Sequence, residues 1–336
     1  MVDVSVVIVC MNRPDNLYPC LESVFKYTTS VSFEVLVVAY LYDKDSLAKA
    51  RTDFPKVRFI ESDEIRGFAE NNNLALEQAQ GRYCFVLNDD TVLTMPVIDK
   101  LVQDFALLPP KAAILSPKIF SGDGSLQLLG RPEHSAWHYI LQQFHLWSEK
   151  ADNVSGQVSP IAASKDIYPT SDITGAAFLI RTDIFRKMGW FDETYFFTPE
   201  DMALSTQVRT NYYGVYVDAG CSLIHKWKTT SSRMLRATRP AAIRGSLIFF
   251  SGGIASSGLR YLAVALPVWI AESLKRVKAR AVLALTPASS PEYQTRRTAY
   301  LTFRNITRSI FTKESPKDLF IKYYTELREE KEKVSV

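Results

Sequence analysis

Two acidic clusters and one histidine in this chain have the residue types that a metal-assisted transfer reaction needs. Asn88-Asp89-Asp90 directly follows the apolar run 83–87, Glu200-Asp201 comes later, and His225 ends another strand-like stretch. Hard divalent cations prefer oxygen ligands and keep positions open for substrate phosphates, and a carboxylate near a hydroxyl group can remove its proton. A second interpretation also fits these residues: 88–90 form a turn, Asp201 caps a helix and His225 is an ordinary polar side chain.

Alternating strand and helix patterns over the first hundred residues predict where the first cluster lies. Strand-like apolar runs occur at 4–9, 33–38, 57–60 and 83–87, with helical stretches between them around 16–27, 46–54 and 69–79. Each helical stretch has the length of a crossover, and right-handed crossovers join parallel strands. Ligands of such sheets collect outside the carboxyl ends of the strands, so residues 88–90 are expected at a ligand crevice. The turn at 10–14 has no GxGxxG sequence, which argues against a dinucleotide.

The middle of the chain has a looser pattern. Strand candidates lie at 113–116, 126–129, 173–180 and 215–218, and a helix is expected to begin after Pro199-Glu200-Asp201, where acidic residues favour a helix N-terminus. Residues 134–167 are aromatic and irregular, and we interpret them as an acceptor-binding loop.

The last third of the chain is basic. From Arg233 onward there are 19 Lys and Arg against 8 Asp and Glu, a balance of +11, whereas the preceding residues carry 21 against 28, a balance of −7. This asymmetry indicates an anionic partner such as a membrane surface or a polyphosphate, and nucleic acid is disfavoured because no reader motif is present.

An apolar stretch at 261–271 lies between Arg260 and the basic residues Lys275, Arg276, Lys278 and Arg280. It is too short to cross a bilayer core of about 30 Å, which takes ~20 residues. It fits an interfacial amphipathic helix with a basic rim, and a helix packed on the catalytic domain is the alternative. The charge run 326–333 is expected to be a frayed, solvated helix.

Length and composition set the organisation. With 336 residues, 47% hydrophobic and 23% charged, the chain can form one large globular domain with an appendage. We expect a catalytic domain at 1–232, with a nucleotide-sugar half at 1–110 and an acceptor half at 111–232, and a helical, basic extension at 233–336. The four cysteines lack CxxC spacing, and no positively charged segment precedes the first apolar run, so we expect buried thiols, no signal peptide and a cytoplasmic location.

Several segments, in this order, resemble family 2 glycosyltransferases. They are 6–13, 67–75 and 81–91, followed by 174–181, 189–193, Glu200-Asp201 and His225. The set is similar to the rhamnosyltransferase-like branch, which builds bacterial surface polysaccharides. The resemblance runs from residue 4 to about 232 and implies a single Rossmann-like α/β domain of GT-A type with a mixed central sheet, followed by the helical extension. It also implies an inverting hexosyltransferase that uses a nucleotide sugar.

The resemblance implies a role for each matching residue. Asp201 and Glu200 are the expected catalytic residues, and Asp201, the last of the pair, is the expected general base. Asp90 and His225 are expected to hold a divalent cation, Mn²⁺ or Mg²⁺. Donor contacts are expected from Asn12, Arg13, Arg66, Gly67, Asn73, Asn88 and Asp89, and a loop with Lys226, Lys228 and Arg233 is expected to close over the diphosphate. Two departures from the family pattern are Asn88, at the first position of Asp-x-Asp, and Ala39-Tyr40-Leu41-Tyr42-Asp43, in place of the acidic segment that contacts the nucleobase; Tyr40 or Asp43 would take over that contact.

The expected reaction is a single displacement with inversion. The donor is a dTDP- or UDP-linked hexose such as rhamnose, the acceptor a glycan or polyprenyl-linked sugar, and the location the cytoplasm or the inner face of the cell membrane. An inactive carbohydrate- or membrane-binding subunit of the same fold and a nucleotidyltransferase are the alternatives.

Overall fold

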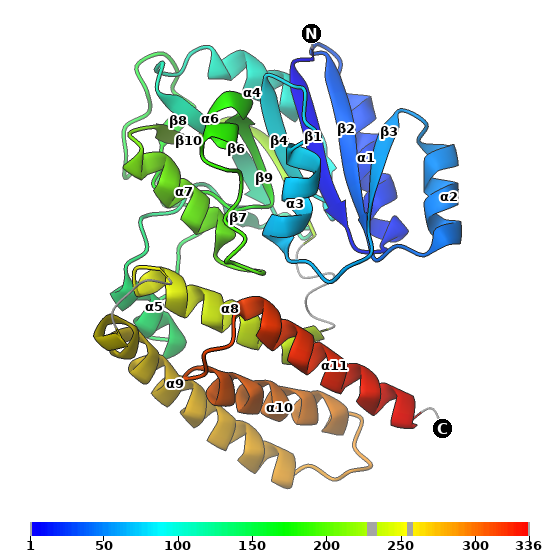
Figure 1. Ribbon diagram of the computed structural model, residues 1–336. Helices are drawn as coiled ribbons and strands as arrows, with labels where there is room; N and C mark the ends of the chain where they lie inside the picture. Colours follow the sequence, from blue (N-terminus) through cyan, green and yellow to red (C-terminus); the bar gives the residue numbers. More distant parts are fainter. Residues whose placement is uncertain (1, 227–233, 254–257, 335–336) are drawn as a thin grey trace. The chain divides into compact units, whose positions relative to one another are not determined.

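The computed structural model describes residues 2–226, 234–253 and 258–334 (Figure 1). The chain forms two compact units. The first contains 1–133, 149–193 and 200–229, and the second contains 134–148, 194–199 and 230–336. The division predicted after residue 232 lies close to the start of the last of these segments, while 134–148 and 194–199 group with the C-terminal helices.

The first unit is built on a ten-stranded sheet. Its strands are β1 (Val4–Cys10), β2 (Phe33–Tyr40), β3 (Val57–Ser62), β4 (Tyr83–Asn88), β5 (Thr91–Leu93), β6 (Ala112–Phe120), β7 (Leu126–Leu128), β8 (Ile167–Pro169), β9 (Ala177–Arg181) and β10 (Gly214–His225). Its helices are α1 (Pro14–Tyr27), α2 (Lys44–Asp53), α3 (Phe68–Leu76), α4 (Val97–Phe105), α6 (Thr182–Lys187) and α7 (Glu200–Thr210).

The sheet is mixed, as the family resemblance implied. Its main order is β3-β2-β1-β4-β9-β6-β10-β5. The four N-terminal strands are parallel, which confirms the crossover prediction, and β9 runs antiparallel to both of its neighbours, β4 and β6. β6 and β10 are parallel, and β5 is antiparallel to β10. The carboxyl ends of β1 and β4 therefore lie side by side, with Val9 opposite Asn88.

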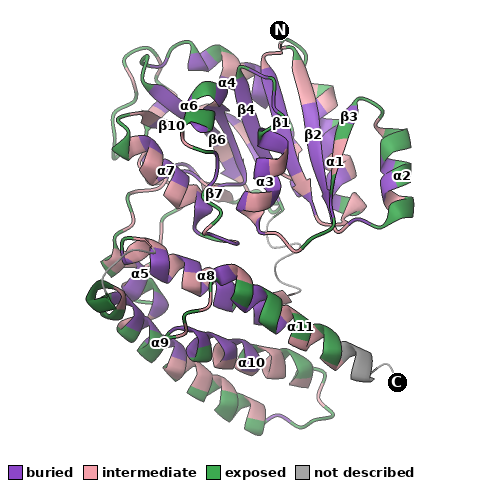
Figure 2. Ribbon diagram, in the orientation of Figure 1, coloured by how far each residue is buried: buried purple, intermediate pink, exposed green. Residues whose placement is uncertain are grey.

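Helices cover both faces of this sheet, and for this reason its central strands are continuously apolar. Alternate residues of β1 enter different cores: Val6 packs in the core that contains Leu17 of α1 and Leu101 of α4, while Val7 packs in the core that contains Leu76 of α3. Figure 2 shows these strands as almost wholly buried. All four cysteines are buried and unpaired. The rigid layers leave the loops at the strand ends to carry polar side chains.

Two expectations for the middle of the chain were inaccurate. β9 begins at Ala177, four residues later than predicted, because the N–H groups of Ile173 and Gly175 donate to the side chains of Asp172 and Asp201 and not to a neighbouring strand. Residues 134–167 are not irregular throughout, because they contain α5 (Ala136–Gln143), whose first turn is capped by the Ser135 hydroxyl. The aromatic composition of this segment obscured its helical period.

The second unit is helical. It contains α5, α8 (Leu235–Phe250), α9 (Gly258–Ala284), α10 (Tyr293–Ser309) and α11 (Pro316–Val334). Side chains from four of these helices share a core, among them Ile140, Leu247, Val268 and Ile306. The run predicted as frayed lies in α11, where Glu330 forms two hydrogen bonds, of 2.7 and 2.8 Å, with the buried guanidinium of Arg236. These contacts lower the pKa of Glu330 to about 2 and tie this part of α11 to α8.

Candidate active site

Strand pairing brings Asp90 and His225 together across 135 positions of sequence. β5 pairs with β10 so that His225 lies opposite Thr91, and the N–H of Lys226 donates to the carbonyl of Asp90 at 2.9 Å. The Nε2 atom of His225 is 3.1 Å from Oδ1 of Asp90, and both residues are buried. Asn88 approaches the same Nε2 atom at 3.4 Å. We call Asn88, Asp89, Asp90 and His225 the aspartate–histidine cluster.

The other ring nitrogen of His225 determines what Nε2 can do. Nδ1 lies 2.7 Å from Oε1 of Gln127 in β7, and an amide oxygen only accepts, so in this arrangement Nδ1 carries a proton. In the neutral ring Nε2 then points a lone pair at the carboxylate of Asp90. Two acceptors facing each other at 3.1 Å require a cation between them, either a proton on Nε2 or a metal ion. Adjacent ligands of an octahedral ion bound at about 2.1 Å are about 3 Å apart, so the pair fits a divalent cation.

The cluster provides few protein ligands. Within residues 2–226, 234–253 and 258–334, no group of three or more His, Cys, Asp and Glu side chains is arranged to hold a metal. Asp89 is adjacent, and burial together with the charge of Asp90 raises its pKa to about 7. A site with two protein ligands suits Mg²⁺-like ions, which retain water and take their remaining ligands from substrate phosphates.

The loop after β1 contains the predicted donor residues Asn12 and Arg13. Asn12 has a left-handed backbone conformation (φ 45°), and its buried Oδ1 atom has no hydrogen-bond partner in the described part of the chain. Arg13 makes two hydrogen bonds to Asp15, at 2.6 and 2.9 Å. An unsatisfied buried acceptor is unfavourable, so Asn12 has the free capacity that a ligand contact requires.

The other predicted donor residues are engaged within the protein. Arg66 pairs with Glu64 at 2.8 Å, and the N–H of Gly67 donates to Glu70 at the start of α3. The side chain of Asn73 bonds the backbone of Phe191 through both its amide nitrogen and its oxygen, and also Glu193, so its visible role is to tie α3 to residues 191–193.

The two candidates for contacting the nucleobase are also engaged. Tyr40 is buried and its hydroxyl accepts from the N–H of Arg66, and Asp43 caps α2. Three residues were predicted to form a loop over the diphosphate. The backbone N–H of Lys226 donates to the carbonyl of Asp90, and Lys228 and Arg233 lie outside the described residues.

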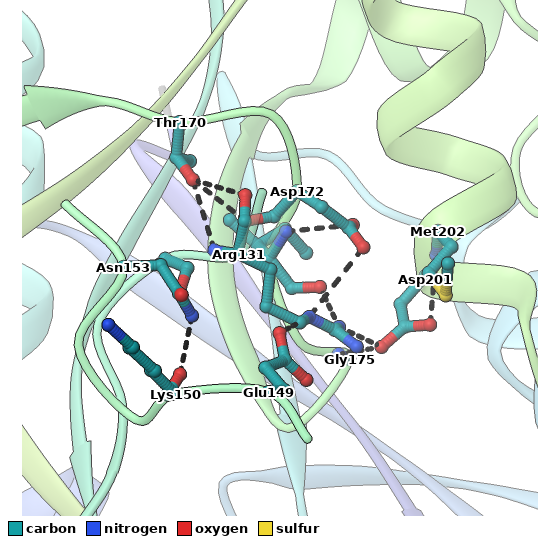
Figure 3. A network of polar contacts seen from close by, with 11 residues as sticks. Arg131, Glu149, Lys150, Asn153, Thr170, Asp172, Gly175, Asp201 and Met202 are labelled. Carbon is teal, nitrogen blue, oxygen red and sulfur yellow. Dashed lines mark hydrogen bonds and ion pairs between the residues drawn. The ribbon is translucent and has the colours of Figure 1, made fainter. Parts of the chain in front are cut away.

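Asp201 lies in the first turn of α7 and accepts three hydrogen bonds (Figure 3). The guanidinium of Arg131 donates to its Oδ2 atom at 2.6 Å, and the N–H of Gly175 donates to the same atom at 3.1 Å. The N–H of Met202 donates to Oδ1 at 2.8 Å. Such charge-assisted contacts fix the orientation of a carboxylate.

Arg131 is the centre of a network that also contains Asp172 and Glu149 (Figure 3). Its Nε atom is 3.6 Å from Asp172 and 3.9 Å from Glu149. Burial works to lower the pKa of Arg131, but the charges of the three carboxylates outweigh it and raise the value. Burial raises the pKa of Asp172 to about 6 and that of Glu149 to about 7, with Arg131 acting against the shift. We call these residues and Asp201 the Arg131 network.

Sequence reasoning missed Arg131. It follows Gly130, whose φ of 69° turns the chain where a side chain would meet Thr170. Its partner Asp201 is 70 residues further on, and nothing local distinguishes this arginine from a surface one.

Glu200, adjacent to Asp201, has the opposite environment. It is buried, and burial followed by the charge of Asp201 raises its pKa well above the usual range. The pair therefore consists of a carboxyl group held by three hydrogen-bond donors and a neighbouring buried carboxyl group whose pKa is raised. Divergent environments of this kind separate the roles of paired acids.

The two clusters border the same piece of backbone. The N–H of Gly175 donates to Asp201, while the carbonyl of the next residue, Ala176, accepts from the N–H of Asn88 at 2.9 Å. The carboxyl end of β4 and the N-terminus of α7 are thus separated by residues 175–176. At one end of its sheet the chain therefore brings the Asp90–His225 pair close to the carboxyl group of Asp201, which three hydrogen bonds hold in place.

The pKa of Glu149 leads to a prediction. Because its folded-state value, about 7, is above its ordinary value of 4.5, the native state retains a proton that the unfolded chain has lost. Its contribution to stability is therefore largest below about pH 4.5 and is lost as the pH rises through 7. Chemical unfolding of the wild type should show a free energy that falls between about pH 5 and pH 8 by about 2 kcal/mol more than that of Glu149→Gln. Parallel pH profiles would contradict this assignment.

Several solved structures share the fold of this chain. Solved structures with a similar fold include GalNAc-T7 with UDP, GalNAc and Mn²⁺ (TM-score 0.55, 14% identity, 97% of this chain and 57% of that chain). Another is the mannosyltransferase PcManGT from Pyrobaculum calidifontis in complex with GDP-Man and Mn²⁺ (TM-score 0.54, 14% identity, 93% and 88%). The predicted GT-A type α/β fold with a mixed sheet is confirmed.

A family model described as Glycosyl transferase family 2 matches residues 5–189, more than half of the chain, and the chain belongs to this family of glycosyltransferases. It is 24% identical over 234 residues to the O-antigen biosynthesis protein RfbC of Myxococcus xanthus, which covers 66% of this chain and 17% of the relative. It is 29% identical over 153 residues to the N-acetylglucosaminyl-diphospho-decaprenol L-rhamnosyltransferase of Mycobacterium tuberculosis, which covers 44% and 48%. The chain thus spans less than half the length of these relatives, which agree with the predicted rhamnosyltransferase-like resemblance.

Proposed function

We propose that this protein is an inverting hexosyltransferase that moves a sugar, such as rhamnose, from a nucleoside diphosphate to a glycan or polyprenyl-linked acceptor in bacterial surface polysaccharide synthesis. One observation supports this most: the aspartate–histidine cluster and Asp201 border the same residues, Gly175 and Ala176. A sugar transferase needs these two functions on opposite sides of one sugar ring.

Asp90 and His225 would hold a divalent cation, Mn²⁺ or Mg²⁺, with Asn88 beside them and Gln127 fixing the ring of His225. When bound, the cation supplies Lewis-acid stabilisation of the charge that develops on the diphosphate leaving group. An amide at position 88 is a weaker ligand than the usual carboxylate, so the donor phosphates would supply much of the affinity. Asn12, whose buried oxygen is unsatisfied, would contact the nucleotide part of the donor.

Asp201 would accept the proton of the attacking acceptor hydroxyl. Arg131 and the N–H of Gly175 both bind Oδ2, so they orient the carboxylate and leave Oδ1 with the single N–H of Met202. Glu200 lies beside it, buried and with its pKa raised above the usual range. Attack from the side opposite the diphosphate inverts the anomeric carbon.

The relatives support the acceptor class. The Mycobacterium tuberculosis relative is named for transfer of L-rhamnose to N-acetylglucosaminyl-diphospho-decaprenol, and by analogy we assign a lipid-linked acceptor reached at the inner face of the cell membrane. Since the matched residues cover less than half of that relative, acceptor and donor are assigned as classes.

A thermal-shift panel tests the proposal. Nucleoside diphosphates and nucleotide sugars with Mn²⁺ should raise the unfolding temperature, because a ligand that binds only the native state stabilises it by RT ln(1 + [L]/Kd), about 2.7 kcal/mol at 100 times Kd. Excess chelator should remove most of the shift. Stabilisation by nucleoside triphosphates alone would favour the nucleotidyltransferase alternative, and no shift with any nucleotide would favour a binding subunit.

A further inference from the structure

Helix α9 has apolar residues on two opposite faces. Val264, Ala265 and Val268 are buried in the core of the second unit, together with Leu247 of α8 and Ile306 of α10. This packing anchors one face of the helix. The opposite face of the helix is exposed to solvent.

The opposite face carries seven large apolar side chains. They are Leu259, Leu262, Leu266, Trp269, Ile270, Leu274 and Val277, with exposed fractions from 37% for Trp269 to 80% for Leu259. Their spacing by three and four residues places them along one side of the helix over about 27 Å. We call these seven residues the α9 stripe. Contiguous exposed apolar surface of this kind marks a site of interaction with a protein or a membrane.

The borders of the α9 stripe are basic. At 100° per residue, Arg260 and Lys278 fall on one side of it, and Arg276 and Arg280 on the other. The single acidic residue of α9, Glu272, is fully buried and paired with Lys275 at 2.6 Å. Beside this rim, slight burial acts to raise the pKa of Tyr300, but a side-chain hydrogen bond with Arg280 and the charges of Arg280 and Arg276 lower it.

An exposed aromatic pair joins α9 to the segment that follows α10. The ring of Trp269 is 6.2 Å from that of Phe311, and both side chains are solvent-exposed. Aromatic side chains with this exposure are typical of the boundary between lipid headgroups and acyl chains.

We propose that the α9 stripe docks on an anionic lipid bilayer, with its apolar side chains in the acyl boundary and its basic rim at the phosphates. Of the helices that the structure describes, none is long and apolar enough to cross a membrane, so α9 lies in the interface. A second copy of the chain fits this face less well, because a two-fold contact would set one basic rim against another. The inference goes beyond the proposed function, since it depends on α9 and its neighbours alone.

Vesicle flotation tests this surface with the full chain and no nucleotide. The wild type should float with phosphatidylcholine vesicles that contain phosphatidylglycerol, and added salt should weaken the binding. Leu262→Glu/Leu274→Glu should lower the partition coefficient at least about tenfold, because it removes apolar burial and adds charge that lipid phosphates repel. Lys278→Gln/Arg280→Gln should lower it about tenfold on anionic vesicles.

The matched control is Leu107→Glu/Leu146→Glu, which changes two exposed leucines outside α9 and should float like the wild type. Unfolding midpoints verify that every variant is folded. Equal flotation of the α9 variants and the wild type, or no flotation of the wild type, would overturn the proposal. So would a wild-type dimer in sedimentation that Leu262→Glu/Leu274→Glu converts to a monomer without vesicle binding. The thermal-shift panel with nucleotides tests the proposed function separately, because it contains no lipid.

Discussion

The variant Asp201→Asn is expected to lose sugar transfer by about 10³-fold while it keeps its affinity for the donor. Asn cannot accept the proton of the acceptor hydroxyl, and Asp201 belongs to the Arg131 network, apart from the residues assigned to the diphosphate. The measurement is kcat with the donor that stabilises the protein most, together with the Kd of that donor. Asn also lacks the charge that pairs with Arg131, so the unfolding midpoint must be compared as well.

Glu200→Gln is the matched control for this prediction. Burial and the charge of Asp201 raise the pKa of Glu200 well above its usual range, and an uncharged amide has nearly the same shape, so turnover should fall far less than in Asp201→Asn. If Asp201→Asn turned over at the wild-type rate, or if Glu200→Gln were the more damaging change, Asp201 would not be the base.

The second large effect is expected at the aspartate–histidine cluster. His225→Ala and Asp90→Ala should each weaken Mn²⁺-dependent donor binding by about 100-fold. Each variant removes one of the two proposed protein ligands, the imidazole of His225 or the carboxylate of Asp90. Gln127→Ala should weaken it by about tenfold, since it leaves both ligands but frees the ring of His225 to rotate. Titration calorimetry of the donor with Mn²⁺ and with chelator measures both effects.

His138→Ala is the control, because this histidine belongs to the second unit. It should bind the donor as the wild type does. Donor affinity in excess chelator equal to that with Mn²⁺ would argue for a cation-free site and against the role given to His225.

Local patterns were sufficient to predict the nucleotide half of the fold. The runs that became β1 to β4 are apolar, branched and separated by helices of crossover length, so their parallel order follows from chain chirality. The meeting of Asp90 and His225 was inferred from motif order, and it depends on the pairing of β5 with β10, which no local pattern displays.

The parts that escaped prediction are fixed by tertiary contacts. The role of Arg131 depends on its ion pairs with Asp172 and Asp201, which lie 41 and 70 residues later in the chain. Asn73 matches a donor motif, yet its side chain is used to hold residues 191–193. The helix α5 was not predicted, because it lies in an aromatic segment. An interfacial helix was predicted at 261–271, but which of its residues are exposed depends on how its other face packs.

The most direct test of the central claim is to locate Mn²⁺ in crystals of the protein grown with Mn²⁺ and the nucleoside diphosphate that stabilises it most. The account predicts an anomalous scattering peak within bonding distance of Asp90 and of Nε2 of His225, with the diphosphate on the ion and the carboxylate of Asp201 facing the vacant sugar position. A peak bound elsewhere, or a nucleotide that leaves Asp90 and His225 untouched, would contradict it.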